Sequence, residues 1–248
     1  MCFDSFFWLH IKKSAGITTR EYLKPYYKEV DRVNKPFSFI QAKPNEFNDV
    51  LNNYRVVLGQ YQFKRALFAK EFLYPDNWDK ICSFAFSREP VDRCISMFYY
   101  LYYKKRSFAG NILKVYNNLK MRKKIGISLS YDFDLFLELI EIAHFESDSI
   151  YKPKGLHFST HTAPMFGDVT DNEGNLLLKK IYRLEDLNEG IKQIFELSNI
   201  NHRIPEIIYA NKNLRRGGFV PSKFQHNKIS KLFAKDFGIY ENAGNALK

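Results

Sequence analysis

The stretch WLHIKKSAGITT, residues 8–19, joins an apolar segment to a short loop of lysines, small residues and hydroxyls. The apolar run from Phe6 to Leu9 is typical of a buried strand, and the residues after Gly16 predict a helix that begins near Ile17. A helix N-terminus has free N–H groups and a partial positive charge. The stretch therefore predicts an anion-binding loop between a strand and a helix.

The residue types in this loop suit a phosphate or a sulfate. Charge comes from Lys12 and Lys13, and Gly16 allows the backbone to approach a ligand closely. Backbone or hydroxyl groups come from the remaining loop and helix-start residues, Ser14, Ala15, Ile17, Thr18 and Thr19. The nucleotide P-loop pattern, Gly-x-x-x-x-Gly-Lys-Ser/Thr, is not matched, because Lys13 precedes Gly16. On this stretch alone, a strand followed by an ordinary capped helix also explains the pattern.

The remaining apolar pattern predicts one α/β domain over residues 1–248 with a central parallel sheet flanked by helices. Buried strands are expected at 3–11, 55–59 and 80–87, and a late strand in KKIYRLEDL (179–187) is followed by a helix to about residue 197. Further helices are expected at 17–27, 90–105, 132–143 and 226–236. We interpret 104–126 and 144–176 as inserted segments, and the second of them as long loops over one face.

Composition narrows the function without deciding it. The formal net charge of +11 fits an anionic partner such as a phosphorylated cofactor, an acidic glycan or a nucleic acid, and equally a solubilising surface. Apolar runs of membrane-spanning length are absent, and the N-terminal residues read as a strand rather than a signal peptide. Of the three cysteines, Cys82 and Cys94 are expected to be core thiols, with a bridge between them as the alternative. This cysteine usage predicts a protein of a reducing compartment, the cytoplasm.

A second loop with anion-binding character lies in SFAFSREPVDRCISMFYYLYY, residues 83–103. A buried strand is expected to end at Arg88, and a helix to start at Pro90, where a missing N–H has no cost. Ser96 lies off the apolar stripe of this helix and can present its hydroxyl beside Arg88, which makes a second phosphate site. Arg93 can join this site or pair with Glu89 at i, i+4, and we favour the pairing.

Together, HIKKSAG…T and SREPVDRCIS resemble the two signatures of sulfotransferases that use 3′-phosphoadenosine 5′-phosphosulfate (PAPS). The carbohydrate sulfotransferases are the most similar, with the usual forms HIPKTGGTS and R-[DE]-P-x-x-R-x-x-S. The segments YRLEDL (182–187) and LFAKDFGIY (232–240) resemble a late strand end and the closing helix of that family. The resemblance spans about residues 6–240 and implies the P-loop-like sulfotransferase fold.

By this resemblance, Lys13 contacts the 5′-phosphosulfate and stabilises the charge that develops on the bridging oxygen. Backbone N–H groups of Gly16, Ile17 and Thr18 hold the 5′-phosphate, and Thr18 or Thr19 adds a hydroxyl. Arg88 and Ser96 hold the 3′-phosphate, and no metal is required. The basic loop YANKNLRRGGFVP (209–221) resembles the loop that closes over the cofactor, so Arg215 and Arg216 are candidate contacts, or part of a solvated loop.

The acceptor side departs from the family pattern. VVLGQYQF (56–63) resembles a segment that often carries Gly-His, but Gln60 stands at the histidine position, so it can orient a hydroxyl but not take its proton. Other candidate bases are His161, which lies in a His-x-x-Pro element or is a surface histidine, and Glu185, which can equally be a helix-start acid. We interpret His10 as structural.

The sequence therefore predicts a PAPS-dependent sulfotransferase that modifies a hydroxyl of a carbohydrate, glycolipid or polysaccharide, releasing the desulfated product (PAP). A P-loop kinase of a small metabolite is the alternative enzyme, although the lysine geometry counts against it. A nucleic-acid-binding domain is the non-enzymatic alternative, but recognised motifs of that class are absent. We expect no nucleic-acid partner, no transmembrane segment and no metal.

Overall fold

The computed structural model describes residues 6–23, 51, 58–103, 129–145, 156–200 and 219–244. Its sheet has three parallel strands in the order β1-β2-β3, namely Phe6–Leu9, Cys82–Ser87 and Lys180–Arg183. In register, Trp8 of β1 lies opposite Phe84, and Phe86 of β2 lies opposite Tyr182. Strands β1 and β2 are buried along their whole length and are largely apolar, as parallel strands usually are, whereas β3 has charged, half-buried residues at both ends.

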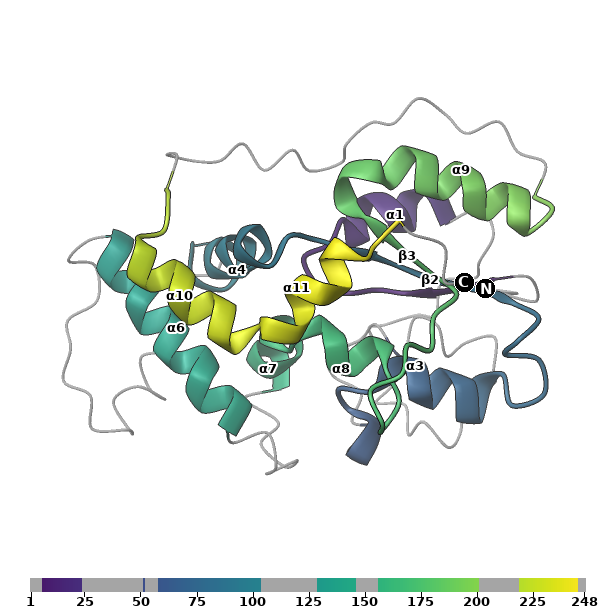
Figure 1. Ribbon diagram of the computed structural model, residues 1–248, viewed down its shortest axis with the longest axis horizontal. Coiled ribbons are helices and arrows are strands. Elements are labelled where there is room, and N and C mark those ends of the chain that lie inside the picture. Colours follow the sequence, from purple (N-terminus) through teal and green to yellow (C-terminus); the bar gives the residue numbers. More distant parts are fainter. Residues whose placement is uncertain are drawn as a thin grey trace, which may run out of the picture.

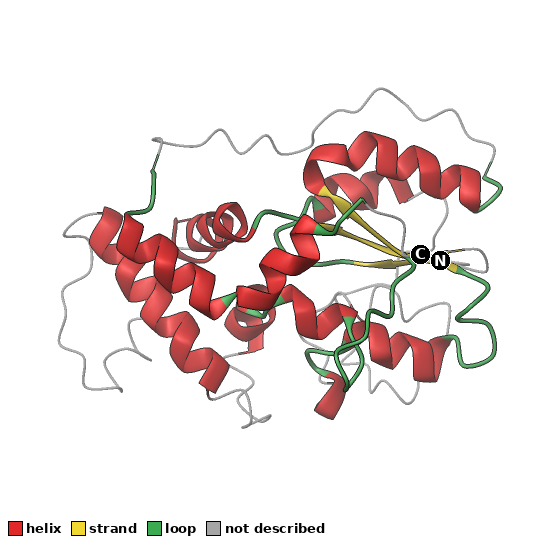
Figure 2. Ribbon diagram, viewed as in Figure 1, coloured by secondary structure: helices red, strands yellow, loops and turns green. Residues whose placement is uncertain are grey.

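Helices surround the sheet and extend beyond its carboxyl edge (Figures 1 and 2). The α-helices are α1 (Gly16–Leu23), α3 (Arg65–Phe68), α4 (Pro90–Phe98), α6 (Leu129–Phe145), α7 (Leu156–Thr162), α8 (Met165–Val169), α9 (Leu187–Leu197), α10 (Lys223–Leu232) and α11 (Ala234–Glu241). Short 3-10 turns cover Gly59–Tyr61 and Leu184–Asp186, and π-helical turns cover Ala69–Leu73 and Tyr99–Tyr103.

The sheet lies between two layers of helices. Figure 1 shows α1 and α9 on one side and α3 and α8 on the other. The approach of α9 is close, since a Cβ on Gly190 would lie 2.9 Å from both Phe86 and Tyr182. Buried side chains of the strands and of both layers form one apolar core. That core fixes the strand ends, from which the loops of interest begin.

A second apolar core lies beyond the carboxyl edge of the sheet, between α4, α6 and α10. Its centre is a cluster of aromatic rings, with Phe98 5.1 Å from Phe133 and 5.5 Å from Phe136 between ring centroids. Val91 and Phe98 of the predicted stripe are buried in it, and Ile95 packs against it. Because α4 packs in this second core and begins only three residues after β2 ends, the core fixes the start of α4 near the carboxyl end of β2.

The predicted α/β fold with a central parallel sheet is confirmed, with some corrections to its elements. The strand expected at 55–59 is wrong for its last two residues, because Leu58 precedes a 3-10 turn that begins at Gly59. Residues 55–57 lie outside the described residues. The loops expected over 144–176 include the helices α7 and α8, because apolar residues such as Met165 and Val169 are buried in the core. The last predicted helix is two helices, α10 and α11.

The cysteines behave as the sequence predicted. Cys82 and Cys94 are both buried and both free, so the alternative of a bridge between them is wrong. Burial raises the pKa of each thiol, which makes both poor nucleophiles. Among the helices that the structure describes, none is long and apolar enough to cross a membrane.

Candidate anion-binding and catalytic site

The loop between β1 and α1 has an unusual backbone. Lys13 and Ala15 have φ values of 69° and 52°, in the left-handed region that side chains other than glycine rarely adopt. Such a conformation persists only where the surroundings hold it. Alternation of left-handed and right-handed residues turns backbone N–H groups into a concavity that suits an anion. The predicted anion-binding loop therefore has the backbone that this role needs.

Three arginines bind the carbonyl oxygens of this loop. Arg65 donates from Nη1 to the carbonyl of His10 at 3.2 Å, Arg93 from Nε to that of Lys12 at 3.1 Å, and Arg88 from Nη1 to that of Lys13 at 3.4 Å. Carbonyl oxygens repel anions, so their attachment to cationic side chains favours an anion site at the loop.

Two of these arginines are buried and paired with buried carboxylates. Arg65 forms a bidentate pair with Asp168 of α8, at 2.9 and 2.5 Å. Arg93 lies 3.3 Å from Asp236 of α11 and also donates to the carbonyl of Ala163 at 2.7 Å. Asp236 in turn accepts from the backbone N–H groups of residues 165 and 166, at the start of α8. Both pairs therefore join the loop to α8.

The predicted pairing of Arg93 with Glu89 is wrong. Arg93 points into the protein toward Asp236, where burial and desolvation lower the pKa of its guanidinium. Glu89 instead caps α4, accepting from the backbone N–H of Asp92 at 2.7 Å. The true partner, Asp236, lies in the segment LFAKDFGIY and is fully buried.

His10 and Gly16 determine how α1 begins. The His10 ring stacks on Trp8, with centroids 5.2 Å apart, and its Nε2 lies 1.7 Å from the position that a Cβ on Gly16 would occupy. Burial and the nearby Lys12 lower the pKa of His10 well below its usual value, so the ring is neutral. The His10 ring therefore leaves room only for glycine at position 16. This packing agrees with the structural role that the sequence analysis gave to His10.

Lys13 and His161 meet at the ring of Tyr100. The Lys13 Nζ lies 4.2 Å from the Tyr100 ring centroid, and the His161 ring stacks on Tyr100 with centroids 5.0 Å apart. His161 is buried, and its Nδ1 lies 2.7 Å from the carbonyl of His157. Burial, with Lys12 as the next cause, lowers the pKa of His161 to about 2. The structure therefore brings a candidate base close to the candidate catalytic lysine.

The hydroxyl residues of the loop and helix start are largely enclosed. Ser14 is 2 % exposed, Thr18 6 % and Thr19 0 %, whereas Ile17 is 54 % exposed. The Oγ of Ser14 and the Oγ1 of Thr19 have no hydrogen-bond partner among the described residues. Unsatisfied buried hydroxyls are costly, and Thr160, Tyr182 and Ser198 have them as well. Those of Ser14 and Thr19 differ in that they lie at the loop and the start of α1, where a polar ligand could satisfy them.

The second predicted site adjoins the first. Arg88 directly follows β2 and contacts the Lys13 carbonyl, and Ser96 is buried two turns into α4. Lys12 of the loop is buried, at 6 % exposure, close to His10 and His161. The ends of β1 and β2 are neighbours in the sheet, which places both predicted anion-binding stretches at one edge.

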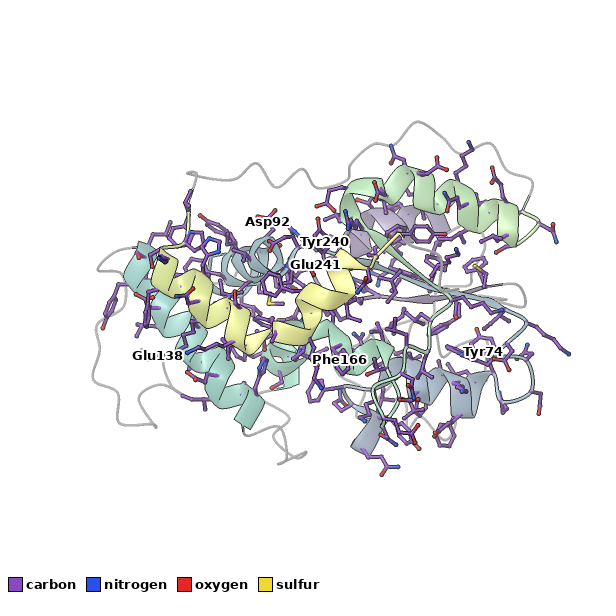
Figure 3. The ribbon with its side chains drawn as sticks, in the orientation of Figure 1. Tyr74, Asp92, Glu138, Phe166, Tyr240 and Glu241 are labelled. Atoms are coloured by element: carbon purple, nitrogen blue, oxygen red, sulfur yellow. The ribbon has the colours of Figure 1, made fainter. Side chains whose placement is uncertain are left out.

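The remaining predicted site residues lie on other segments than the loop and α4. Gln60 is exposed in the 3-10 turn Gly59–Tyr61, next to Tyr61, whose hydroxyl donates to Glu71 at 2.6 Å. Glu185 is exposed after β3 and close enough to Tyr240 to contribute to the raised pKa of that phenol, whose main cause is burial; Figure 3 labels Tyr240 in α11. Arg215 and Arg216 lie outside the described residues. Metal-binding groups of histidine, cysteine and acidic residues are absent from the part of the chain that is described.

Sequence reasoning missed Arg65, Asp168 and Tyr100. Arg65 and Asp168 come from segments far apart in the chain, and neither belongs to a recognisable motif. Tyr100 lies in a run of tyrosines, and the π-helical turn Tyr99–Tyr103 changes the angular positions that α-helical spacing predicts. The i, i+4 spacing of His157 and His161 was a signal that could have been used.

The site consists of a strand, a loop with left-handed residues and a helix N-terminus near several cationic side chains. This arrangement is typical of α/β proteins that bind a phosphate or sulfate group at the helix N-terminus. Comparison with known families gives the particular one: the chain belongs to the sulfotransferase family, whose sequence model matches residues 3–241. Searches of curated proteins and of solved structures give no significant match.

Proposed function

We propose that this protein transfers the sulfuryl group of PAPS to a hydroxyl of a carbohydrate acceptor, such as a glycan, polysaccharide or glycolipid. The single observation that carries the proposal is the loop itself, in which Lys13 follows a strand and three arginines hold the neighbouring carbonyl oxygens. Membership of a sulfotransferase family supports sulfuryl transfer as the reaction.

The residues present fit the proposed donor. The orphaned hydroxyls of Ser14 and Thr19 and the left-handed residues Lys13 and Ala15 support a phosphate-binding loop at the start of α1. Backbone N–H groups of Gly16, Ile17 and Thr18 would hold the 5′-phosphate. A second anionic group of the same ligand would bind Arg88 and Ser96, since their strand end adjoins the loop.

When bound, PAPS supplies an activated sulfuryl group with a phosphate as its leaving group. Lys13 would stabilise the negative charge that develops on the oxygen between phosphorus and sulfur, which is the main contribution a protein makes to such a transfer. Lys12 raises the local positive potential of the loop. Arg88 would distinguish a 3′-phosphorylated nucleotide from ADP.

His161 is our preferred base for the acceptor hydroxyl. A backbone carbonyl only accepts, so the Nδ1 of His161 carries the hydrogen that it donates to His157, and Nε2 carries the lone pair. The ring is neutral and lies beside the Tyr100 ring that Lys13 covers. Glu185 is a second candidate base, and Gln60 a candidate acceptor contact, because both are exposed to an incoming substrate.

The test is a transfer assay with radiolabelled PAPS and a panel of sugars, glycolipids and acidic polysaccharides, with labelled ATP and magnesium in parallel. Sulfated sugar without phosphorylated product is the expected result, and phosphoryl transfer would support the kinase alternative instead. The cytoplasmic location, the absence of a nucleic-acid partner and the contacts of Arg215 and Arg216 remain predictions from the sequence.

A further inference from the structure

Tyr100 connects two segments of the candidate site that are distant in the chain. It lies in the π-helical turn Tyr99–Tyr103 that continues α4. Its ring contacts Lys13 of the anion-binding loop, with Nζ 4.2 Å from the centroid, and stacks on His161 of α7, with an angle of 24° between ring planes. A π-helical turn inside or after an α-helix often occurs at a functional site, because it redirects one side chain.

The contact with Lys13 is a cation–π interaction, in which the ammonium is attracted to the ring face. A lysine side chain has several rotatable bonds, and their freedom is lost when the ammonium binds an anion. A ring that already restrains the ammonium near the loop reduces this loss and so favours anion binding.

The contact with His161 holds that ring at a fixed place beside the loop cations. His161 is further restrained by its hydrogen bond to the His157 carbonyl and by the His157 ring, 4.2 Å away between centroids. Among the described residues, the charged and titratable groups that face it are Lys12 and Lys13 from the loop, His157 from α7, Tyr100 from the turn Tyr99–Tyr103, and His10, which follows β1. An anion at the loop would offset the two lysine charges, so His161 would gain proton affinity when the donor binds.

From this geometry we propose that Tyr100 is a positioning residue, which holds the Lys13 ammonium and the His161 ring next to each other so that anion binding at the loop is sensed at His161. The inference deepens the proposed function and rests on it for the identity of the anion. It concerns a residue outside both sequence signatures.

Two variants of the full-length protein separate the ring from the hydroxyl, and a third is the control. Tyr100→Phe keeps the ring, and Tyr100→Leu removes it. Tyr99→Leu makes the same change one residue earlier, at a tyrosine whose ring packs 5.6 Å from Phe98. Binding of inorganic pyrophosphate and of PAP is measured by calorimetry, and the NMR signals of the His161 ring are followed near neutral pH with and without each ligand.

We expect both ligands to shift the NMR signals of the His161 ring in the unmodified protein, in Tyr100→Phe and in Tyr99→Leu. In Tyr100→Leu, affinity should fall about three- to tenfold, as expected for loss of one cation–π contact, and the His161 response should be reduced. Unchanged affinity and response in Tyr100→Leu would overturn the proposal.

Should Tyr100→Leu fold poorly, the phenylalanine of Tyr100→Phe is replaced by its trifluorinated analogue, which weakens the ring's attraction for cations while nearly keeping its shape. The proposal then requires weaker binding, and equal binding contradicts it. A third outcome is that PAP binds no better than pyrophosphate while both affinities still depend on Tyr100. This result would argue against PAPS as the donor and would support the role of Tyr100. No binding of either ligand would contradict both.

Discussion

Arg93 and Asp236 lie 3.3 Å apart between Nη1 and Oδ2, in the buried space between the anion-binding loop and α8. The same guanidinium donates to the carbonyls of Lys12 and Ala163, so it joins the segment before Lys13 to the segment after His161. This ion pair therefore contributes to the relative position of the candidate catalytic lysine and the candidate base, together with the Arg65–Asp168 pair.

Asp236→Ala should destabilise the protein by about 3–5 kcal/mol, because it leaves the Arg93 charge buried without its carboxylate. Urea unfolding measures the change. The control is Glu141→Ala, which removes a pair with Lys228 whose side chains are 46 % and 20 % exposed. That change should cost less than about 1 kcal/mol, as surface pairs do. Equal effects of the two substitutions would contradict a special role for Asp236.

Gly16→Ala should disrupt the start of α1, because the new Cβ would overlap the His10 ring. Overpacking of this kind costs about 1–3 kcal/mol, and anion binding should weaken with it. Gly238→Ala is the control, since no atom lies within 4 Å of a Cβ there and the residue is within α11. The double variant with His10→Ala should recover part of the loss. Failure of the second substitution to help would show that His10 is not the obstacle.

Acid should destabilise the fold through its buried histidines. Burial lowers the pKa of His10, His144 and His161, the last to about 2, so the unfolded chain binds more protons below its own histidine pKa. This contribution is fully present above the unfolded pKa of about 6.5 and is lost progressively as pH falls toward the folded pKa. His161 alone should account for about 2 kcal/mol between about pH 8 and pH 5.

Unfolding free energies of His161→Gln over that pH range test this point. The variant should show a shallower loss of stability in acid than the unmodified protein. His226→Gln, at an exposed position on α10, should keep the full slope. Parallel curves for all three proteins would rule out His161 as a source of the acid sensitivity.

Lys13→Ala should lower turnover by at least about a hundredfold, the usual effect of removing a group that stabilises transition-state charge. Lys235→Ala is a matched control, because Lys235 also lies over an aromatic ring, 4.5 Å from the Phe166 centroid, but is exposed on α11. It should keep normal turnover. Normal turnover in Lys13→Ala, measured with any acceptor found in the transfer assay, would exclude Lys13 from the mechanism.

Local patterns predicted the parts of the fold and site that are contiguous in sequence. The apolar runs located β1 and β2, and the small-residue stretch after β1 located the loop, because strands and capped helix starts leave short-range signals. The partners of Arg65 and Arg93 were not predictable in the same way, since Asp168 and Asp236 approach them only through tertiary packing. The reason for glycine at 16 was also hidden, because it depends on a ring six residues earlier.

The most direct test of the account is a calorimetric titration with PAP, against ADP and ATP with magnesium, for the unmodified protein and for Arg88→Ala. We predict tight binding of PAP, much weaker binding of both controls, and a loss in Arg88→Ala that is far larger for PAP than for ADP. A preference for ATP with magnesium, or an equal loss for PAP and ADP, would contradict the proposed donor or the proposed place of its 3′-phosphate.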